Sequence, residues 1–362
     1  MCLVIAYHDP GSDTPLCVME TRDEDVYRRH GAVALRDFGR SSKSPFDEHW
    51  RCEDHLAGLF LVHDEASPVL AARPVGGFDA AGGTWVAYSQ TTGIYARLLI
   101  GVFADGELGE SATRALQEQR ALLGYIHRGG LCLDAVAYPS ARIAAEVLPE
   151  ELRKKLLNTR RSVLPFILFI ADLDGAYILK FNEALQAHVH RVAPRRLTMV
   201  SVHGADSPRS GVTNRLAASY AAAERPDPRE RDGWDSWLAL AHPQSYFGND
   251  WANQGALPYH HPDWRSYSYS VFQPPYFNVA GDLNHRRPWE EHPNPDDKVE
   301  WTSSTTLFAM NADGAPSLLY HQRHLEAGSP IPLDVAPGDY PISSRDLRRA
   351  ALAPARSSKA RV

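Results

Sequence analysis

The sequence predicts an α+β fold in which helices pack against antiparallel sheets. Three observations support this class. The first twenty residues have the pattern of a β-hairpin, the helical stretches lie together between groups of strands, and a second hairpin signal lies near the C-terminus. Runs of strands separated by runs of helices are typical of layered α+β proteins, whereas regular βαβ alternation would indicate a parallel sheet.

The N-terminal hairpin joins an apolar run at 2–7 to a second run at 16–19 through a turn cluster at 9–13. Paired residue numbers in an antiparallel ladder sum to a constant, and a turn centred near Ser12 sets that sum near 24. Cys2 is therefore expected to face the stretch 21–23.

The remaining elements follow from hydrophobic periodicity and turn residues. A polar turn ending at Gly93 joins the strands predicted at 82–88 and 94–100, and Asp172–Gly175 forms the turn between those predicted at 166–171 and 176–181. We predict further strands at 82–88, 94–100, 166–171, 176–181, 197–202, 305–310 and 317–321, the last two joined by a turn at 311–314. We predict helices from Ser111 to about Ile126, from about 140 to 157 with a break around Pro149, and at 214–223.

The chain has 362 residues, which as a soft prior suggests two domains, but a single layered domain also reaches this size. We favour one domain over residues 1–325, with an insertion rich in proline, histidine and aromatic residues at about 225–300. A long segment of this kind serves as a lid or binding element, or packs over the core. Residues 326–362 are expected to form a partly disordered extension.

The composition is that of a globular protein, with 38 Lys and Arg against 44 Asp and Glu and a formal net charge of −6. This charge disfavours nucleic acid and anionic lipid as partners, and no apolar run is long enough to span a membrane. The four cysteines (Cys2, Cys17, Cys52 and Cys132) form no CxxC pair. We therefore expect a cytoplasmic protein with a small-molecule substrate, and the sequence leaves the oligomeric state open.

Cys2 is the most informative residue for chemistry. A small side chain after the initiator methionine permits removal of Met1, which leaves one residue carrying both a thiol nucleophile and an α-amine base. An α-amine has an ordinary pKa of about 7.7–8.0 and a thiol one of about 8.5, which a neighbouring guanidinium lowers further. Arg22 is predicted to stabilise a thiolate or hold a substrate carbonyl or carboxylate, and Asp23 to orient the α-amine. The alternative is that Cys2 is a small buried hydrophobic residue.

Several motifs occur in an order that resembles the NRDE family, the homologues of transport and Golgi organisation protein two. The resemblance covers residues 1–325, and its motifs are MCLVIAY at the start, TRDE at 21–24, GGTW at 82–85, RGGLCLDAV at 128–136, VHG at 202–204 and SSTTLF at 303–308. Each motif is weak alone, but the ordered set, anchored by Met-Cys and Arg-Asp-Glu, is fairly specific.

The resemblance implies an N-terminal-nucleophile hydrolase fold, with four layers in the order αββα and two antiparallel sheets between helices. It implies a nucleophilic Cys2 supported by Arg22 and Asp23, which resemble the arginine and aspartate of bile-salt and penicillin amidases. Trp85 and His203 belong to the motifs and are predicted to line the substrate site. A core tryptophan and a hydrogen-bonded structural histidine are the alternatives.

This chain departs from the family pattern at four places, which are Thr21, Leu99–Ile100, Asp206–Ser207 and Thr302. The first three replace asparagine-containing positions, and Thr302 replaces an arginine. Losing one oxyanion donor typically costs roughly 10²–10³ in rate, so either backbone amides hold the oxyanion or the chemistry has diverged.

The function we predict is a cysteine N-terminal-nucleophile amidohydrolase or acyltransferase acting on an amide, ester or thioester. The long aromatic insertion suggests a specialised substrate and a biosynthetic role. The alternative is a protein that binds or carries haem or another hydrophobic ligand without catalysis. No cofactor is predicted, and no metal, because neither His188 with His190 nor His321 with His324 has a carboxylate or cysteine at metal-ligand spacing.

Overall fold

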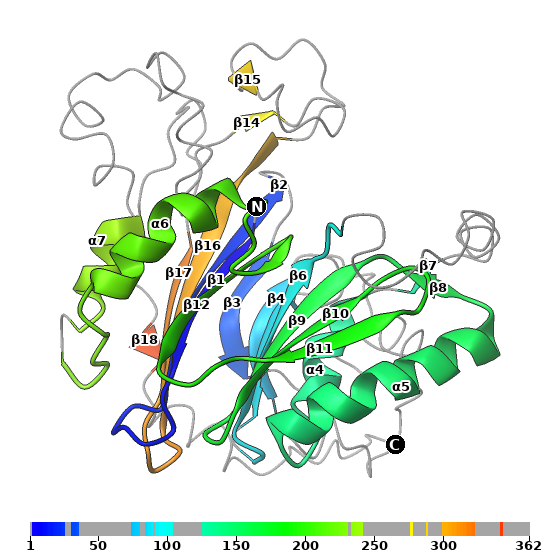
Figure 1. Ribbon diagram of the computed structural model, residues 1–362, viewed down its shortest axis with the longest axis horizontal. Helices are drawn as coiled ribbons and strands as arrows, with labels where there is room; N and C mark the ends of the chain where they lie inside the picture. The colour runs from blue at the N-terminus through cyan, green and yellow to red at the C-terminus, as the bar shows by residue number, and fades with distance from the viewer. Residues whose placement is uncertain are drawn as a thin grey trace, which may run out of the picture.

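The fold is seen in a computed structural model of the chain (Figure 1). The described residues are 2–25, 30–35, 74–79, 84–89, 91–103, 125–126, 128–230, 233–241, 276–277, 287–288, 299–322 and 341–342. Two antiparallel sheets and several helices make up this part, so the predicted α+β class is confirmed.

The N-terminal sheet contains the first hairpin. Its strands are β13 (Gly204–Ala205), β12 (Arg196–Ser201), β1 (Leu3–His8), β2 (Leu16–Asp25), β16 (Val299–Met310), β14 (Tyr276–Phe277) and β15 (Arg287–Pro288), with β17 (Pro316–Gln322) and β18 (Pro341–Ile342) following β16. The ladder between β1 and β2 runs from Leu3 opposite Thr21 to His8 opposite Leu16. Each pair sums to 24, so the predicted register is confirmed, and its continuation by one residue places Cys2 opposite Arg22.

The second sheet is formed by seven strands in an antiparallel order. They are β11 (Ala187–Arg191), β10 (Ala176–Phe181), β9 (Phe166–Ala171), β6 (Ile94–Ile100), β5 (Val86–Ser89), β4 (Pro74–Asp79) and β3 (His30–Leu35). Gly93 has a φ of +70°, as the predicted turn before β6 requires. A separate parallel pair joins β7 (Tyr125–Ile126) to β8 (Ser162–Val163).

The helices cover the outer faces of the two sheets (Figure 1). Helices α4 (Leu131–Ala135), which follows a 3₁₀ turn at Arg128–Gly130, and α5 (Ala141–Thr159) share one apolar cluster with the second sheet. Helices α6 (Gly211–Ala222) and α7 (Asp235–Ala241) share another with the N-terminal sheet. A third cluster, formed by residues of both sheets, includes Val4, Val18, Phe169 and Phe308 and lies between the sheets.

Strand alternation decides which side chains enter this inter-sheet layer. On β2, Leu16 and Val18 contribute to it, whereas Cys17 and Met19 face α6 and α7. The same period of two assigns the even-numbered residues of β1 and β2, including Glu20 and Arg22, to the inter-sheet side. Cys2, which directly precedes β1, packs against the same cluster.

Several predicted elements are confirmed and three are corrected. The strands at 166–171 and 176–181 and the hairpin around 311–314 are confirmed. The predicted break at Pro149 is wrong, because α5 continues through it. The buried face of α5, with Leu148, Leu152 and Leu156, packs on the second sheet and outweighs the lost hydrogen bond.

The other corrections concern element boundaries. The strand predicted at 82–88 begins only at Val86. Ile126, predicted at the end of a helix, lies in β7, and the rest of that predicted helix, like the C-terminal extension beyond 342, falls outside the described residues.

The aromatic insertion at 225–300 is described only in part. Within it, α7 carries Trp237, and Trp234 precedes the helix. Both indole rings are buried, and they pack edge to face at 5.9 Å. This part of the segment therefore packs over the N-terminal sheet. The remaining aromatic residues, on which the ligand-binding alternative depends, lie mostly outside the described residues.

In the described part of the chain, none of the helices combines the length and the apolar character needed to cross a membrane.

Asp172 fixes the turn between β9 and β10 and the start of α5. Its carboxylate accepts hydrogen bonds from the backbone N–H groups of Ala141 at 2.7 Å, Gly175 at 2.9 Å and Asp174 at 3.0 Å. We expect Asp172→Ala to lower the free energy of unfolding by roughly 1–3 kcal/mol, because buried donors lose their acceptor. Urea denaturation measures this, with Asp172→Asn as the control that keeps one oxygen. Equal midpoints for the alanine variant and the wild type would contradict the prediction.

Candidate active site

Cys2 lies just before the first residue of β1, at the end of the inter-sheet layer. Its side chain is half-buried and packs against the inter-sheet cluster. The Sγ atom donates a hydrogen bond to the backbone carbonyl of Asp23 at 3.6 Å, so the predicted proximity of Cys2 to the stretch 21–23 is confirmed. The thiol is thus held at the meeting point of β1, β2 and the second sheet.

Arg22 and Trp85 form a stacked pair in the same layer. Both side chains are buried, and the Arg22 guanidinium carbon lies 4.5 Å from the centroid of the Trp85 ring. A cation over an indole face is attracted by the ring electrons, so this stacking fixes where the guanidinium lies. Trp85 comes from the segment just before β5, so the stacked pair also joins the two sheets.

Asp23 is the last of the predicted catalytic residues on β2. The register between β2 and β16 shifts between Thr302 and Ser304, and this irregularity places Thr302 opposite Asp23. The buried Thr302 hydroxyl donates a hydrogen bond of 2.6 Å to Asp23 Oδ1. Thr302, one of the four departures from the NRDE pattern, therefore orients the predicted partner of the Cys2 α-amine.

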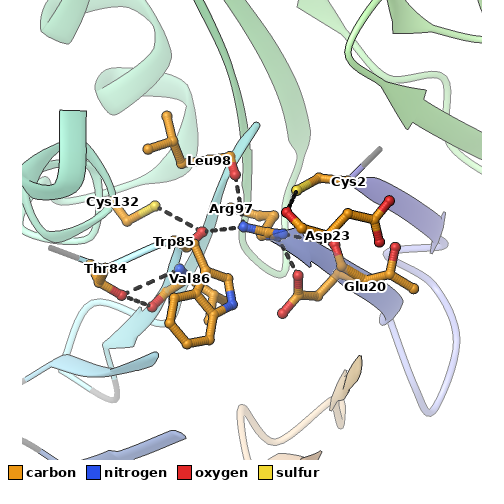
Figure 2. Close-up of polar contacts among 10 residues, drawn as sticks. Cys2, Glu20, Asp23, Thr84, Trp85, Val86, Arg97, Leu98 and Cys132 are labelled. Carbon is orange, nitrogen blue, oxygen red and sulfur yellow. Dashed lines mark hydrogen bonds and ion pairs between the residues drawn. The ribbon is translucent and has the colours of Figure 1, made fainter. Parts of the chain in front are cut away.

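A buried ion pair that the sequence analysis missed lies behind Cys2 (Figure 2). The Arg97 Nε atom pairs with the Glu20 carboxylate, and both side chains are almost completely excluded from solvent. Arg97 also donates to three backbone carbonyls, those of Leu98 at 2.7 Å, Thr21 at 2.8 Å and Trp85 at 2.9 Å.

The charge of Arg97 is maintained despite its burial. Desolvation lowers its pKa, but the neighbouring Glu20 carboxylate, followed by the Cys2 sulfur, outweighs this effect, so the pKa of Arg97 lies above its ordinary value. In the sequence, Arg97 alternates with Tyr95 and Leu99, and Glu20 alternates with Leu16 and Val18. A charged residue on an otherwise apolar strand face was the signal that could have identified both.

His203 lies on the connection after β12, the strand that pairs with β1 on the side opposite β2. Val4 is opposite Val200 in the antiparallel β1–β12 ladder. The residues just before β1 and just after β12, which include Cys2 and His203, therefore lie at the same end of these two strands. Its Nδ1 atom is 3.2 Å from the backbone carbonyl of Val102, whose N–H donates to Val202. These contacts give His203 a structural role in joining the two sheets, and its predicted contact with substrate stays a prediction.

The two other described cysteines have a different environment. Cys17 and Cys132 are buried, and all three described cysteines are free thiols. Burial raises the pKa of Cys17 to about 11, although Arg225 opposes the change, and burial raises that of Cys132 even further against the opposing charge of Arg97. Their thiols are therefore protonated near neutral pH. Of the three, Cys2 is the accessible one.

The described side chains were predicted to hold no metal ion. Among them, no group of three or more His, Cys, Asp or Glu residues is arranged to hold a metal ion. His188 and His190 share one exposed face of β11, while the side chains of His321 and His324 lie outside the described set.

No protein-family model and no curated protein matches this sequence. The candidate site is therefore defined by its own geometry, and membership of the NRDE family stays a prediction from the motifs.

Replacing Thr302 by valine tests the hydrogen bond to Asp23. Valine keeps the shape but removes the donor, and a hydrogen bond to a charged group contributes about 1.5–3 kcal/mol. We expect Thr302→Val to lower the free energy of unfolding by about this amount, and Thr302→Ser to retain most of it. Chemical denaturation of the three proteins measures the difference. Identical stabilities of the valine and serine variants would contradict the role given to the hydroxyl.

Proposed function

We propose that the protein is a cysteine-dependent N-terminal-nucleophile enzyme that cleaves or transfers the acyl group of an amide, ester or thioester. The observation that carries the proposal is the position of Cys2. Its half-buried thiol is hydrogen-bonded to the Asp23 backbone carbonyl, and the β1–β2 register, continued by one residue beyond the Leu3–Thr21 pair, puts Arg22 opposite Cys2. A thiol nucleophile at a strand end that also carries an arginine and an aspartate has the groups that acyl transfer needs.

The arrangement of layers also supports this proposal. Helices α4 and α5 pack on one sheet, α6 and α7 pack on the other, and the two sheets pack together. The four-layer αββα fold that the NRDE resemblance implies has the same order of layers, with the terminal nucleophile at the end of a sheet strand.

In the proposed reaction, removal of Met1 frees the α-amine of Cys2. The thiol proton moves to this amine as Sγ bonds to the carbonyl carbon, and the carbonyl electron pair moves to oxygen. Collapse of the tetrahedral intermediate breaks the bond to the leaving group, which takes the proton from the ammonium. The product is a thioester on Cys2.

The second half of the reaction releases the acyl group. Water or an acceptor amine attacks the thioester and gives a proton to the α-amine. When this second intermediate collapses, the carbon–sulfur bond breaks and the proton returns to Sγ. An acceptor amine in place of water makes the reaction a biosynthetic acyl transfer.

Arg22 is the residue that receives the substrate carbonyl in the proposed reaction. The positions where family members carry asparagine hold other groups here. Ile100 is 52% exposed, and Asp206 Oδ1 accepts a hydrogen bond from the Met199 N–H at 2.9 Å. A guanidinium donates hydrogen bonds and carries charge, so Arg22 can stabilise a developing oxyanion without a side-chain amide.

Rapid-mixing measurements with activated acyl thioesters and 4-nitroanilides test this function. A covalent mechanism predicts a burst that releases up to one leaving group per chain, followed by a slower steady rate. Added amine acceptors accelerate the slow phase if the enzyme transfers its acyl group to amines. Leaving-group release no faster than in buffer, across the whole panel, would contradict the proposal.

A further inference from the structure

The contacts of Arg97 bring together the backbone on both sides of the Arg22 and Trp85 pair. Thr21, whose carbonyl accepts from Arg97 at 2.8 Å, immediately precedes Arg22. The Trp85 carbonyl accepts from the same guanidinium at 2.9 Å. Arg97 therefore holds the chain that carries the Arg22 guanidinium and the chain that carries the ring beneath it.

These contacts also connect the two sheets at the level of Cys2. Arg97 belongs to β6 of the second sheet, while Glu20 and Thr21 belong to β2 of the N-terminal sheet. Figure 2 shows the Arg97 guanidinium between Trp85 on one side and Glu20, Asp23 and Cys2 on the other. A shift of Arg97 would thus move Arg22 relative to Cys2.

Arginine is suited to this position because of its geometry. A planar guanidinium carries five N–H donors in a fixed arrangement, and here they meet three carbonyls and one carboxylate. A lysine retains the charge that Glu20 requires, but its compact ammonium group has three donors and cannot reproduce the planar arrangement.

We propose that Arg97 is a positioning residue that holds the Arg22 guanidinium beside the Cys2 thiol. The inference rests on the proposed function, because the held guanidinium would receive the substrate carbonyl or a negatively charged part of the substrate. Arg97 itself is buried behind Cys2 and acts through Arg22.

The test compares two alkylating reagents of similar size, anionic iodoacetate and neutral iodoacetamide. Mass spectrometry of the Cys2 peptide gives the rate constant for each reagent. Their ratio is independent of how much of the thiol is ionised, and it rises when a cation lies beside the sulfur. Cross-strand neighbours have Cβ atoms about 4.5–5.5 Å apart. For a unit charge about 6 Å from the reacting sulfur, at the dielectric constant of water, removal of the charge corresponds to a change of about threefold.

We expect Arg22→Gln to lower the iodoacetate to iodoacetamide ratio by about threefold or more. Arg97→Lys should lower it as well, although the charge at position 97 is retained. In the Arg22→Gln background, Arg97→Lys should have no further effect, since a residue that acts only through Arg22 is not additive with it. Arg225→Lys is the matched control and should leave the ratio unchanged. Arg225 stacks on Tyr7 at 4.7 Å and lies 3.6 Å from Asp9, so its contacts are with residues other than Cys2 and Arg22.

An unchanged iodoacetate to iodoacetamide ratio in folded Arg97→Lys would overturn the proposal. So would a decrease in this ratio on Arg97→Lys that is equally large in the wild-type and the Arg22→Gln backgrounds. If Arg97→Lys does not fold, the double variant Glu20→Gln/Arg97→Gln replaces it, because two neutral amides remove the buried charges together. The same two outcomes apply to that variant.

The alkylation rates require no acyl transfer. A chain that shows the expected ratios but no burst with thioesters would retain the positioning role of Arg97 and refute the proposed function. A chain that shows a burst with thioesters, but whose alkylation ratio is unchanged in Arg97→Lys, would support the proposed function and refute the positioning role of Arg97.

Discussion

Replacing Arg97 by glutamine is expected to lower the free energy of unfolding by about 3–5 kcal/mol. The substitution leaves the Glu20 carboxylate in an almost completely buried site without its counterion, and it withdraws hydrogen bonds from three backbone carbonyls. Equilibrium denaturation in urea, followed by circular dichroism, measures this loss.

A double-mutant cycle separates the charge from the other contacts. In Glu20→Gln/Arg97→Gln the uncompensated charge disappears, so we expect the double variant to be more stable than Arg97→Gln alone. Arg142→Gln is the control, because Arg142 and its partner Glu146 are 63% and 56% exposed and such pairs contribute about 0–1 kcal/mol. A loss for Arg97→Gln no larger than that for Arg142→Gln would contradict the account of the buried pair.

Substitution of Cys2 is expected to have the largest effect on activity. Cys2→Ala removes the nucleophile, and loss of a nucleophile in a covalent mechanism lowers kcat by about 10³–10⁶-fold. The steady release of 4-nitroaniline or thiol from the best substrate of the panel measures this change, and the burst should disappear with it.

Cys17→Ala provides the matched control for that experiment. Cys17 lies on the face of β2 that packs towards α6 and α7, and its thiol donates to the Pro226 carbonyl at 3.6 Å. Its removal should leave the burst amplitude per folded chain unchanged. An active Cys2→Ala variant would place the chemistry at another residue.

Much of the fold follows from local sequence signals. The turn at 9–13 and the period of two on both sides of it determine the β1–β2 register, and the predicted sum of 24 is found in every pair of the ladder. Pro149 shows where local rules fail, since a helix-breaking propensity is outweighed by the burial of a long apolar helix face on a sheet. The spacing of residues along the chain contains no measure of that burial.

The site was predictable in part for the same reason. Cys2, Arg22 and Asp23 come together through one hairpin, so their proximity follows from register alone. Arg97 and Thr302 reach the site from β6 and β16, and their places depend on the packing of two sheets and on an irregularity in the β2–β16 ladder. For Arg97 the sequence contains only an indirect signal, a charged residue on an apolar strand face, and for Thr302 only its departure from the NRDE pattern.

The central claim is that Cys2 becomes an N-terminal nucleophile, and intact-protein mass spectrometry of the native chain tests it most directly. The account predicts a mass without Met1, and the addition of one acyl group after brief exposure to a reactive thioester, with peptide mapping that locates the group on Cys2. The adduct should be absent from Cys2→Ala and present in Cys17→Ala. A retained Met1 together with no adduct on Cys2 would contradict the account.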